Sequence, residues 1–318
     1  MSRPLCPSSM LSREIRVLDL DGSVVKQRNL LARYPHQVIP LQDLGPRARF
    51  WMNSRTRAQI RERIGREGSN SVTFLGSGDF HQVSPILLSR FEEPVSLIVF
   101  DLHPDWDTLP PRFGCGSWVT EALRSGNIQK CVLAGIGSED ISSPGIQSGN
   151  LAALGADRLE IYPYYHAPTR VFLRTVPANI SLKAQRSFLR TKIYWDNLRS
   201  KDLGEFFRLL ISRLPSKKAY ISIDKDCLSS EYALTNWEEG RFSLDELIVM
   251  LEALKEGLEI VGLDITGEYS EIAVAGRLKG VFSRLDHPRE VRAGQLLPEE
   301  VNAVNESTNL KILEALFR

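Results

Sequence analysis

The sequence predicts a three-layer α/β/α protein, in which helices cover both faces of a mostly parallel sheet. Short apolar segments alternate with amphipathic segments along the 318 residues, as in strands joined by helical crossovers. The apolar segments are hydrophobic at successive positions, which is typical of strands buried on both faces. Three of them lead into motifs rich in aspartate and histidine, at the strand ends where open parallel sheets bind ligands.

Six segments rich in β-branched and apolar residues are predicted to form the strands. They are residues 72–75 (VTFL), 96–100 (SLIVF), 130–134 (KCVLA), 159–162 (LEIY), 219–223 (AYISI) and 260–265 (IVGLDI). Ahead of them, residues 15–25 (IRVLDLDGSVV) carry Asp21-Gly22 at their centre, a pair that favours a tight turn between strands. We therefore predict an N-terminal hairpin or an edge extension of the sheet.

Six amphipathic segments are predicted to form helices. They are residues 55–64, 84–91, 118–124, 203–214, 244–254 and 306–317. Ser243 and Glu246 have the spacing of a capping box in front of one of these helices, and Gly257 is placed to close it. Residues 275–295 are polar and weakly periodic, and are predicted to form a long surface loop.

The composition is that of an ordinary globular protein, with 42% hydrophobic residues, 25% charged residues and a net charge of +1. A nucleic-acid partner is not indicated, because lysine and arginine are not in marked excess over the acidic residues. No apolar run reaches the ~18 residues of a membrane helix. The four cysteines form no C-x-x-C pair, which favours reduced thiols and a cytoplasmic location. We expect residues 1–69 to be an extension, with the hairpin and a helix, packed on a metal-binding domain of residues 70–318 as one structural unit.

The first acidic motif is IVFDLHPDWD, residues 98–107, which runs from an apolar strand into carboxylates around one histidine. Asp101 and His103 are two residues apart and therefore project from the same face of an extended chain. Pro104 removes a hydrogen-bond donor and ends the regular pairing, so that Asp105 is free to turn back toward them.

Two further strands end in similar groups. Asp224 and Asp226 follow the strand in YISIDKDCL, and His81 follows VTFL in GSGDFHQ. A single aspartate or histidine, such as Asp107 or His166 alone, is usually a turn former or a satisfied polar group. Four carboxylates and two imidazoles from three strand ends instead match a pair of hard divalent cations, Mn²⁺ best among common metals.

These motifs resemble those of the ureohydrolases, the family of arginase, agmatinase and formimidoylglutamase. FDLHPDWD is similar to the D-x-H-x-D motif of that family, SIDKDCL to its S-x-D-x-D motif, and GSGDFH to its glycine-rich G-G-D-H turn. GIGSED (residues 135–140) and GLDITGE (residues 262–268) also fit, so that the resemblance spans residues 70–317. It implies an arginase–deacetylase-like fold and two manganese ions bound by His81, Asp101, His103, Asp105, Asp224 and Asp226.

The sequence departs from the family pattern at the substrate-facing positions. Phe80 separates His81 from the preceding aspartate, whereas the family's histidine follows its aspartate directly. Asp107 stands where arginase has an asparagine for the substrate's α-carboxylate, and Cys115 stands where it has a proton-shuttling histidine. Glu268 matches the family's substrate-facing glutamate with one residue more of spacing.

The resemblance therefore implies catalytic positions for Asp105, Cys115 and Glu268, and substrate-binding positions for Asp107, Glu139 and Asp140. Because a carboxylate at residue 107 repels an α-carboxylate, we expect a small cationic guanidino substrate other than arginine.

Three functions remain open from the sequence. The first is a dimanganese hydrolase of a C–N bond in a linear amidine or guanidino compound. The second is a zinc amide deacetylase of similar fold, although its paired-histidine base is not found here. The third is a non-catalytic relative that keeps metals for folding or ligand binding, which the absence of the shuttle histidine favours. No nucleic-acid or membrane partner is expected, and both a monomer and a homo-oligomer are compatible with the sequence.

Overall fold

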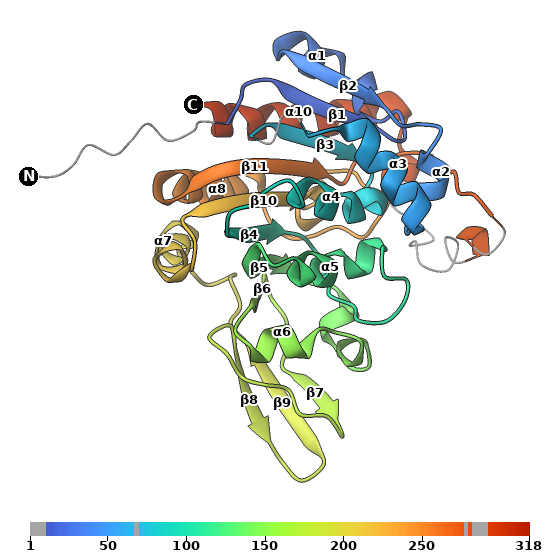
Figure 1. The fold of residues 1–318 in the computed structure, drawn as a ribbon. Coiled ribbons are helices and arrows are strands. Elements are labelled where there is room, and N and C mark those ends of the chain that lie inside the picture. Colours follow the sequence, from blue (N-terminus) through green and yellow to red (C-terminus); the bar gives the residue numbers. More distant parts are fainter. Residues whose placement is uncertain (1–10, 67–69, 277–278, 282–291) are drawn as a thin grey trace, which may run out of the picture.

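The computed structural model describes residues 11–66, 70–276, 279–281 and 292–318, and its centre is an eight-stranded sheet (Figure 1). The strand order is β2-β1-β3-β11-β10-β4-β5-β6, and neighbouring strands run parallel throughout. The strands are β1 (Ile15–Asp19), β2 (His36–Pro40), β3 (Val72–Gly76), β4 (Val95–Phe100), β5 (Ile128–Ile136), β6 (Leu159–Pro163), β10 (Lys218–Asp224) and β11 (Glu259–Thr266). All six strands predicted from the sequence are present, and the parallel sheet is confirmed.

Helices cover both faces of this sheet. One layer contains α2 (Gly45–Ala48), α3 (Ser54–Ile64), α4 (Ser84–Leu88), α5 (Trp118–Arg124) and α6 (Leu151–Gly155). The other contains α1 (Arg28–Arg33), α7 (Leu203–Arg213), α8 (Leu244–Gly257) and α10 (Pro298–Phe317). Successive residues of β4 divide between two hydrophobic clusters, Leu97 and Val99 in one, Ile98 and Phe100 in the other. The predicted three-layer architecture is therefore confirmed.

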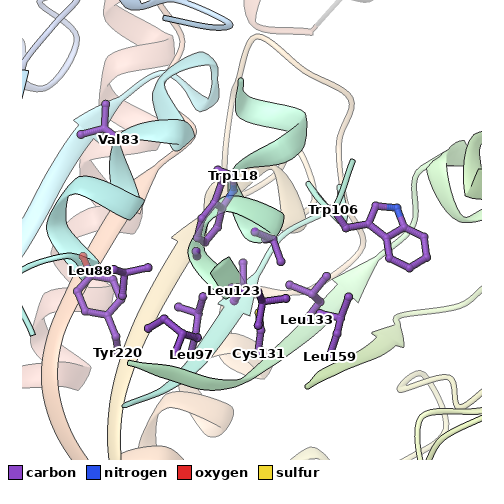
Figure 2. Packing of buried hydrophobic residues seen from close by; sticks show 14 of the residues in the cluster. Val83, Leu88, Leu97, Trp106, Trp118, Leu123, Cys131, Leu133, Leu159 and Tyr220 are labelled. Carbon is purple, nitrogen blue, oxygen red and sulfur yellow. The ribbon is translucent and has the colours of Figure 1, made fainter. Parts of the chain in front are cut away.

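A row of side chains across four strands shows how the core is built. Tyr220, Leu97, Cys131 and Leu159 are register partners on β10, β4, β5 and β6. Figure 2 shows these four side chains side by side, with Leu123 of α5 packed over the row. All five side chains are buried, which fixes the register of the strands whose ends carry the acidic motifs.

Of the two N-terminal alternatives, the edge extension is present, because β2 and β1 are the outermost strands at one edge of the main sheet. The hairpin is wrong, because β1 and β2 are parallel and are joined through η1 (Val24–Lys26) and α1. Asp21 does not turn the chain back. Its Oδ1 accepts hydrogen bonds from the backbone and hydroxyl of Ser23, and its Oδ2 accepts one from the backbone of Ser77. These contacts direct the chain into a helical turn. Gly22, with φ of +74°, supplies the left-handed residue that this turn needs.

The helix signals agree better with the structure. The predicted capping box is present, since the Ser243 hydroxyl accepts from the backbone of Glu246 and the Glu246 carboxylate accepts from the backbone of Ser243. α5 begins at Trp118 as expected. α10 begins eight residues earlier than predicted because Pro298 occupies its first turn. Most of the predicted loop at residues 275–295 lies outside the described residues, and η7 (Arg292–Gln295) lies at its end.

A second sheet, which was not predicted from the sequence, follows β6. β7 (Thr169–Phe172), β8 (Leu182–Arg186) and β9 (Arg190–Trp195) form an antiparallel sheet in the order β7-β9-β8. β7 alternates buried and exposed residues, and β8 is largely exposed, so their patterns lack the continuous apolar runs of the main sheet. Within the described residues, no helix combines the length and the apolar composition needed to cross a bilayer.

Candidate metal centre

The acidic motifs meet at the carboxyl edge of the main sheet. β3, β11, β10 and β4 are successive neighbours, so the segments that follow them leave the sheet at the same edge. Two groups of side chains offer ligand atoms within 4.8 Å of one another, one formed by His81, Asp101 and Asp224, the other by Asp101, His103 and Asp226. Asp101 belongs to both groups. The predicted ligands are therefore brought together, and one carboxylate lies between two candidate metal positions.

His81 reaches this site through η2 (Gly78–Val83), a 3₁₀ helix that follows β3. This helical turn accommodates the residue inserted at Phe80 and directs Asp79 away from the site. Nη1 of Arg49 donates to Oδ2 of Asp79 at 2.6 Å. Gly78 is required where the turn begins, because a Cβ there would lie 2.7 Å from Oδ2 of Asp224. The backbone thus passes directly against one of the candidate ligands.

The orientation of the His81 ring is set by Ser222. Nε2 of His81 lies 2.8 Å from the Ser222 hydroxyl, which itself donates to Oδ1 of Asp264 at 2.6 Å. Because the hydroxyl proton is used on Asp264, Nε2 carries the proton of the His81–Ser222 hydrogen bond. Nδ1 therefore faces the carboxylates, 3.2 Å from Oδ2 of Asp101 and 3.5 Å from Oδ2 of Asp224. This is the arrangement in which a neutral imidazole coordinates a metal.

His103 occupies the equivalent place in the second group. Its Nδ1 lies 2.9 Å from Oδ2 of Asp226 and 3.8 Å from Oδ1 of Asp101. Backbone amides orient the two carboxylates, because Leu102 donates to Asp226 at 3.0 Å and His103 itself donates to Asp101 at 2.7 Å. The C-terminal turns of β4 and β10 are thereby joined across the site.

Asp105 is positioned by the helix that follows it. Its φ is +45°, in the left-handed region that residues other than glycine rarely adopt. The indole of Trp118 donates to Oδ2 of Asp105 at 2.7 Å, and the backbone of Val119 donates to its carbonyl at 3.0 Å. The same Oδ2 lies 3.5 Å from Nδ1 of His81. Strained backbone held by surrounding contacts is a common feature of functional sites.

The charges in this cluster are not balanced by its protein contacts alone. Burial and the neighbouring Asp226 and Asp105 raise the pKa of Asp101 well above its usual range. Burial and Asp226 likewise raise the pKa of Asp224 to about 8. Burial lowers the pKa of His81, but the carboxylates of Asp101 and Asp105 outweigh burial and raise it. Carboxylates that repel each other in this way are typical of sites that bind cations.

Two buried atoms of the cluster lack hydrogen-bond partners, Nδ1 of His81 and Oδ2 of Asp101. Buried polar atoms are almost always paired, so two unpaired atoms that face each other call for a ligand between them. One imidazole nitrogen and several carboxylate oxygens are a donor set that suits Mn²⁺. The residues present therefore fit a pair of divalent cations.

The ligand groups open into a cavity of about 200 Å³, whose wall also contains Asp107, Cys115, Asp140 and Trp237. A second cavity of about 400 Å³ shares His103, Asp140 and Trp237 with the first. Four of the five predicted catalytic or substrate-binding residues of the 98–140 segment thus line the metal cavity, and Glu139 lines the second cavity.

Asp107 and Cys115 lie on neighbouring strands of chain at the cavity wall. The backbone amide of Asp107 donates to the carbonyl of Gly116 at 2.9 Å, and its Oδ1 accepts from the hydroxyl of Ser148 at 2.6 Å. Burial raises the pKa of Asp107, and the nearby carboxylate of Asp140 adds to this effect. The cavity wall next to the metal ligands is therefore acidic.

Glu268 does not occupy the substrate-facing position that the sequence predicted. Its carboxylate is buried and accepts hydrogen bonds from Lys225 at 2.5 Å, Asn309 at 2.7 Å and Gln27 at 3.0 Å. Lys225 is fully buried as well, and an unpaired ammonium in its place would be costly. Because of the extra residue of spacing after Asp264, this glutamate binds Lys225 in the turn that follows β10.

Several residues that shape the site were not singled out from the sequence. Ser222 could have been, because it precedes Asp224 by two residues and projects from the same face of β10. Arg49 and Trp237, which both contact Asp79, lie in irregular segments that carry no periodic signal. Lys225 stands between two aspartates in the sequence, where a lysine is typical of an exposed turn, and was therefore not singled out.

Sequence comparisons with known proteins give limited matches. No protein-family model matches the chain. An uncharacterized protein of Thermotoga maritima is 28% identical over 198 residues, which is 62% of this chain and 58% of that protein, so the match spans little more than half of the relative's length.

Solved structures match over nearly the whole chain. Arginase of Entamoeba histolytica in complex with L-ornithine has a TM-score of 0.59 and 11% identity, covering 97% of this chain and 99% of its own. Formimidoylglutamase of Bacillus subtilis has a TM-score of 0.56 and 14% identity, covering 95% of this chain and 86% of its own. Proclavaminate amidinohydrolase of Streptomyces clavuligerus has a TM-score of 0.54 and 13% identity, covering 98% of this chain and 94% of its own. The resemblance read from the motifs is thus confirmed in three dimensions: the chain has the α/β fold of the arginase, amidinohydrolase and formimidoylglutamase structures.

Proposed function

We propose that the protein is a dimanganese-dependent hydrolase of a C–N bond in a small cationic guanidino compound. The observation that carries this proposal is the double membership of Asp101, whose two oxygens face His81 and His103 in separate ligand groups. A carboxylate that belongs to both ligand groups would serve two cations at once, as two-metal hydrolytic sites need. The fold, shared with hydrolases of linear amidines, supports the same reaction class.

His81, Asp101, Asp105 and Asp224 would hold one ion, and Asp101, His103 and Asp226 the other. Manganese, when bound, supplies the Lewis acidity that hydrolysis of an unreactive guanidinium carbon needs. The chain itself would bind and orient the substrate. The thiol of Cys115, on the cavity wall, is the proposed group that exchanges a proton with the departing nitrogen.

The acidic wall of the cavities supports a cationic substrate. Asp107 and Asp140 line the metal cavity together with the ligand groups, and the second cavity adds Glu139 and Glu238. The rings of Tyr164, Tyr165 and Trp237 line the same second cavity and could contact a cationic chain through their faces. A substrate with a guanidinium at one end and an amine at the other matches both cavities. A free α-carboxylate would meet the charge of Asp107 instead.

The test combines metal analysis with a substrate panel. Protein loaded with Mn²⁺ is expected to hold two ions per chain and to release urea from an agmatine-like amine faster than from arginine. The Asp101→Asn variant should lose both properties. Failure of the Mn²⁺-loaded protein to release urea, ammonia or amine from every guanidino compound would reject the hydrolase.

One observation favours a second candidate, a non-catalytic metal-binding relative. Glu268, the residue expected to hold the substrate's guanidinium, is buried against Lys225 and is absent from the described lining of both cavities. In that case the panel would show two bound ions and thermal stabilisation by Mn²⁺, but no turnover. Stabilisation by a guanidino ligand without hydrolysis would identify this candidate.

A further inference from the structure

A cavity of about 620 Å³ lies between α3 and the end of α4, and it shares no residue with the described lining of the two cavities at the metal centre. Four arginines line it, against two glutamates, Glu62 and Glu92. The charged lining therefore has a net charge of +2, four positive minus two negative. This cavity is unusual in a chain whose overall net charge is only +1.

One of the four arginines has a structural role. Nη2 of Arg90 donates to the carbonyls of Gly65 at 2.8 Å and Ile64 at 3.3 Å, at the C-terminal end of α3. Nη2 of Arg16 donates to the same Ile64 carbonyl at 2.9 Å. These two guanidinium groups close the helix end, and Arg90 adds a fixed positive charge to the cavity wall.

Arg57 and Arg61 are not used in this way. They lie one turn apart on the same face of α3, where like charges repel and destabilise a helix. The Arg57 guanidinium lies 4.9 Å from the centre of the Phe113 ring, and within the described residues it has neither a hydrogen bond nor an ion pair. Burial and the charge of Arg61 lower the pKa of Arg57, with a smaller contribution from Arg112, and the charge of Glu121 only partly opposes them. A half-buried guanidinium without an acceptor lacks the partner that such groups usually have.

Arg112 gives an internal comparison. It lies over the same Phe113 ring, at 5.1 Å, but its Nε and Nη2 both donate to the carboxylate of Glu121, at 2.8 and 3.0 Å. Arg112 is also absent from the described lining of the cavity. Of the two arginines on this ring, only Arg57 therefore offers free donors to the cavity.

We propose that this cavity is a binding site for a small oxyanion ligand, held by Arg57 and Arg61. A guanidinium presents paired donors that match phosphate and carboxylate oxygens, and two of them one turn apart can hold one anionic group. Phe113 fixes the Arg57 side chain before the ligand arrives, which lowers the entropy lost on binding. A volume of about 620 Å³ accommodates a metabolite-sized molecule around the anionic group.

Isothermal titration calorimetry of the full chain tests the site, with inorganic phosphate and succinate as probes at constant ionic strength. Saturable binding of at least one probe is expected, and phosphate against succinate identifies the preferred oxyanion. Arg57→Gln and Arg61→Gln should each weaken binding by about tenfold or more, because charge-assisted hydrogen bonds are lost. Arg112→Gln is the matched control and should bind as the parent does.

Any of three outcomes would overturn the proposal. One is the absence of saturable binding of both probes. Another is an affinity that falls equally in Arg112→Gln, and the third is an affinity that survives in the Arg57→Gln/Arg61→Gln double variant, which would place the anion elsewhere, the metal centre included. Circular dichroism of each variant checks that α3 is intact. Since no turnover is measured, the result does not depend on the proposed hydrolase activity.

Discussion

Oδ2 of Asp101 and Nδ1 of His81 face each other at 3.2 Å, and both atoms are buried without a hydrogen-bond partner. The two residues follow β4 and β3, which belong to one parallel sheet but are separated by β10 and β11, and η2 brings His81 to Asp101. Burial and the neighbouring carboxylates raise the pKa of Asp101, and the carboxylates of Asp101 and Asp105 raise the pKa of His81 against the effect of burial. A cation between them would satisfy both atoms, and this makes metal content the first property to measure.

Substitution Asp101→Asn is expected to reduce bound manganese from two ions per chain to fewer than one. The amide removes the charge shared by both ligand groups, so both sites weaken together. Elemental analysis after dialysis measures the occupancy. The rise in Tm that excess Mn²⁺ gives the parent protein should also disappear, since ligand-linked stabilisation requires binding.

Asp107→Asn is the control for this experiment. Asp107 lines the same cavity but belongs to neither ligand group, so its substitution should leave two ions per chain. Full occupancy in Asp101→Asn would show that the assigned ligands are wrong, whereas equal loss in both variants would indicate a general effect of charge on the site.

The metal-free protein is expected to lose stability as pH rises from about 4 to about 8. The folded-state pKa of Asp224 is raised from 3.8 to about 8, so the folded chain holds a proton that the unfolded chain has released in this window. The raised pKa of His81 acts in the same direction, because its stabilisation is lost as pH rises through the folded-state pKa. Tm measured against pH in the presence of a chelator checks this.

The variant Asp224→Asn should flatten the decline of the metal-free Tm, and Mn²⁺ should reverse it, because metal binding requires deprotonated ligands. A metal-free Tm that rises between pH 5 and pH 8 in the parent would contradict the assignment of buried, mutually repelling carboxylates.

The sheet could be predicted from the sequence because its strands are buried on both faces and read as continuous apolar runs. The strands from Val72–Gly76 onward in the main sheet were all located in this way. β2 and β8 could not, since most of their residues are exposed and their stability comes from partner strands distant in the sequence. The parallel pairing of β1 with β2 was missed because the Asp21-Gly22 signal is local, and local turn signals do not report strand direction.

The candidate ligands could be predicted because their two-residue spacing follows directly from strand geometry. The distance between Asp101 and His81 could not be predicted from spacing, because β11 and β10 lie between their strands and His81 reaches Asp101 through η2. The prediction for Glu268 was wrong because strand spacing does not determine the surroundings of this residue. Its surroundings depend on Lys225, Gln27 and Asn309, and no single spacing in the sequence brings these three residues together.

Lys225→Met is expected to destabilise the protein by about 3–5 kcal/mol, because it leaves the carboxylate of Glu268 buried without its cation. Urea-induced unfolding measures the loss. The double variant Lys225→Met/Glu268→Gln should recover much of it, since the buried charge is gone and the carbonyl oxygen of the new amide can still accept from Asn309. Additive losses in the two substitutions would show that the ion pair is energetically unimportant.

Alkylation is expected to reach Cys115 in the native protein and to slow turnover. Cys115 lines the metal cavity, whereas Cys131 and Cys227 are fully buried. Burial also raises the pKa of the Cys227 thiol, which makes it less reactive. Mass spectrometry locates the modification, and kcat/KM before and after iodoacetamide measures its effect. The Cys115→Ser variant controls for modification elsewhere, and unchanged kinetics after complete reaction at Cys115 would remove this residue from the site.

Asp107 is expected to decide between a cationic amine and an amino acid as substrate. It lines the metal cavity beside Asp140, and two unit charges ~4 Å apart at an effective dielectric constant of ~20 interact by ~4 kcal/mol. The parent protein should therefore prefer an agmatine-like substrate over arginine in kcat/KM. Asp107→Asn should lower that preference about tenfold or more, because the repulsion of the α-carboxylate is removed. Ser148→Ala, which removes the hydroxyl that donates to Asp107 but keeps its charge, is the matched control and should leave the preference largely intact. A parent protein that favours arginine, with a ratio that Asp107→Asn does not change, would show that Asp107 contacts neither substrate.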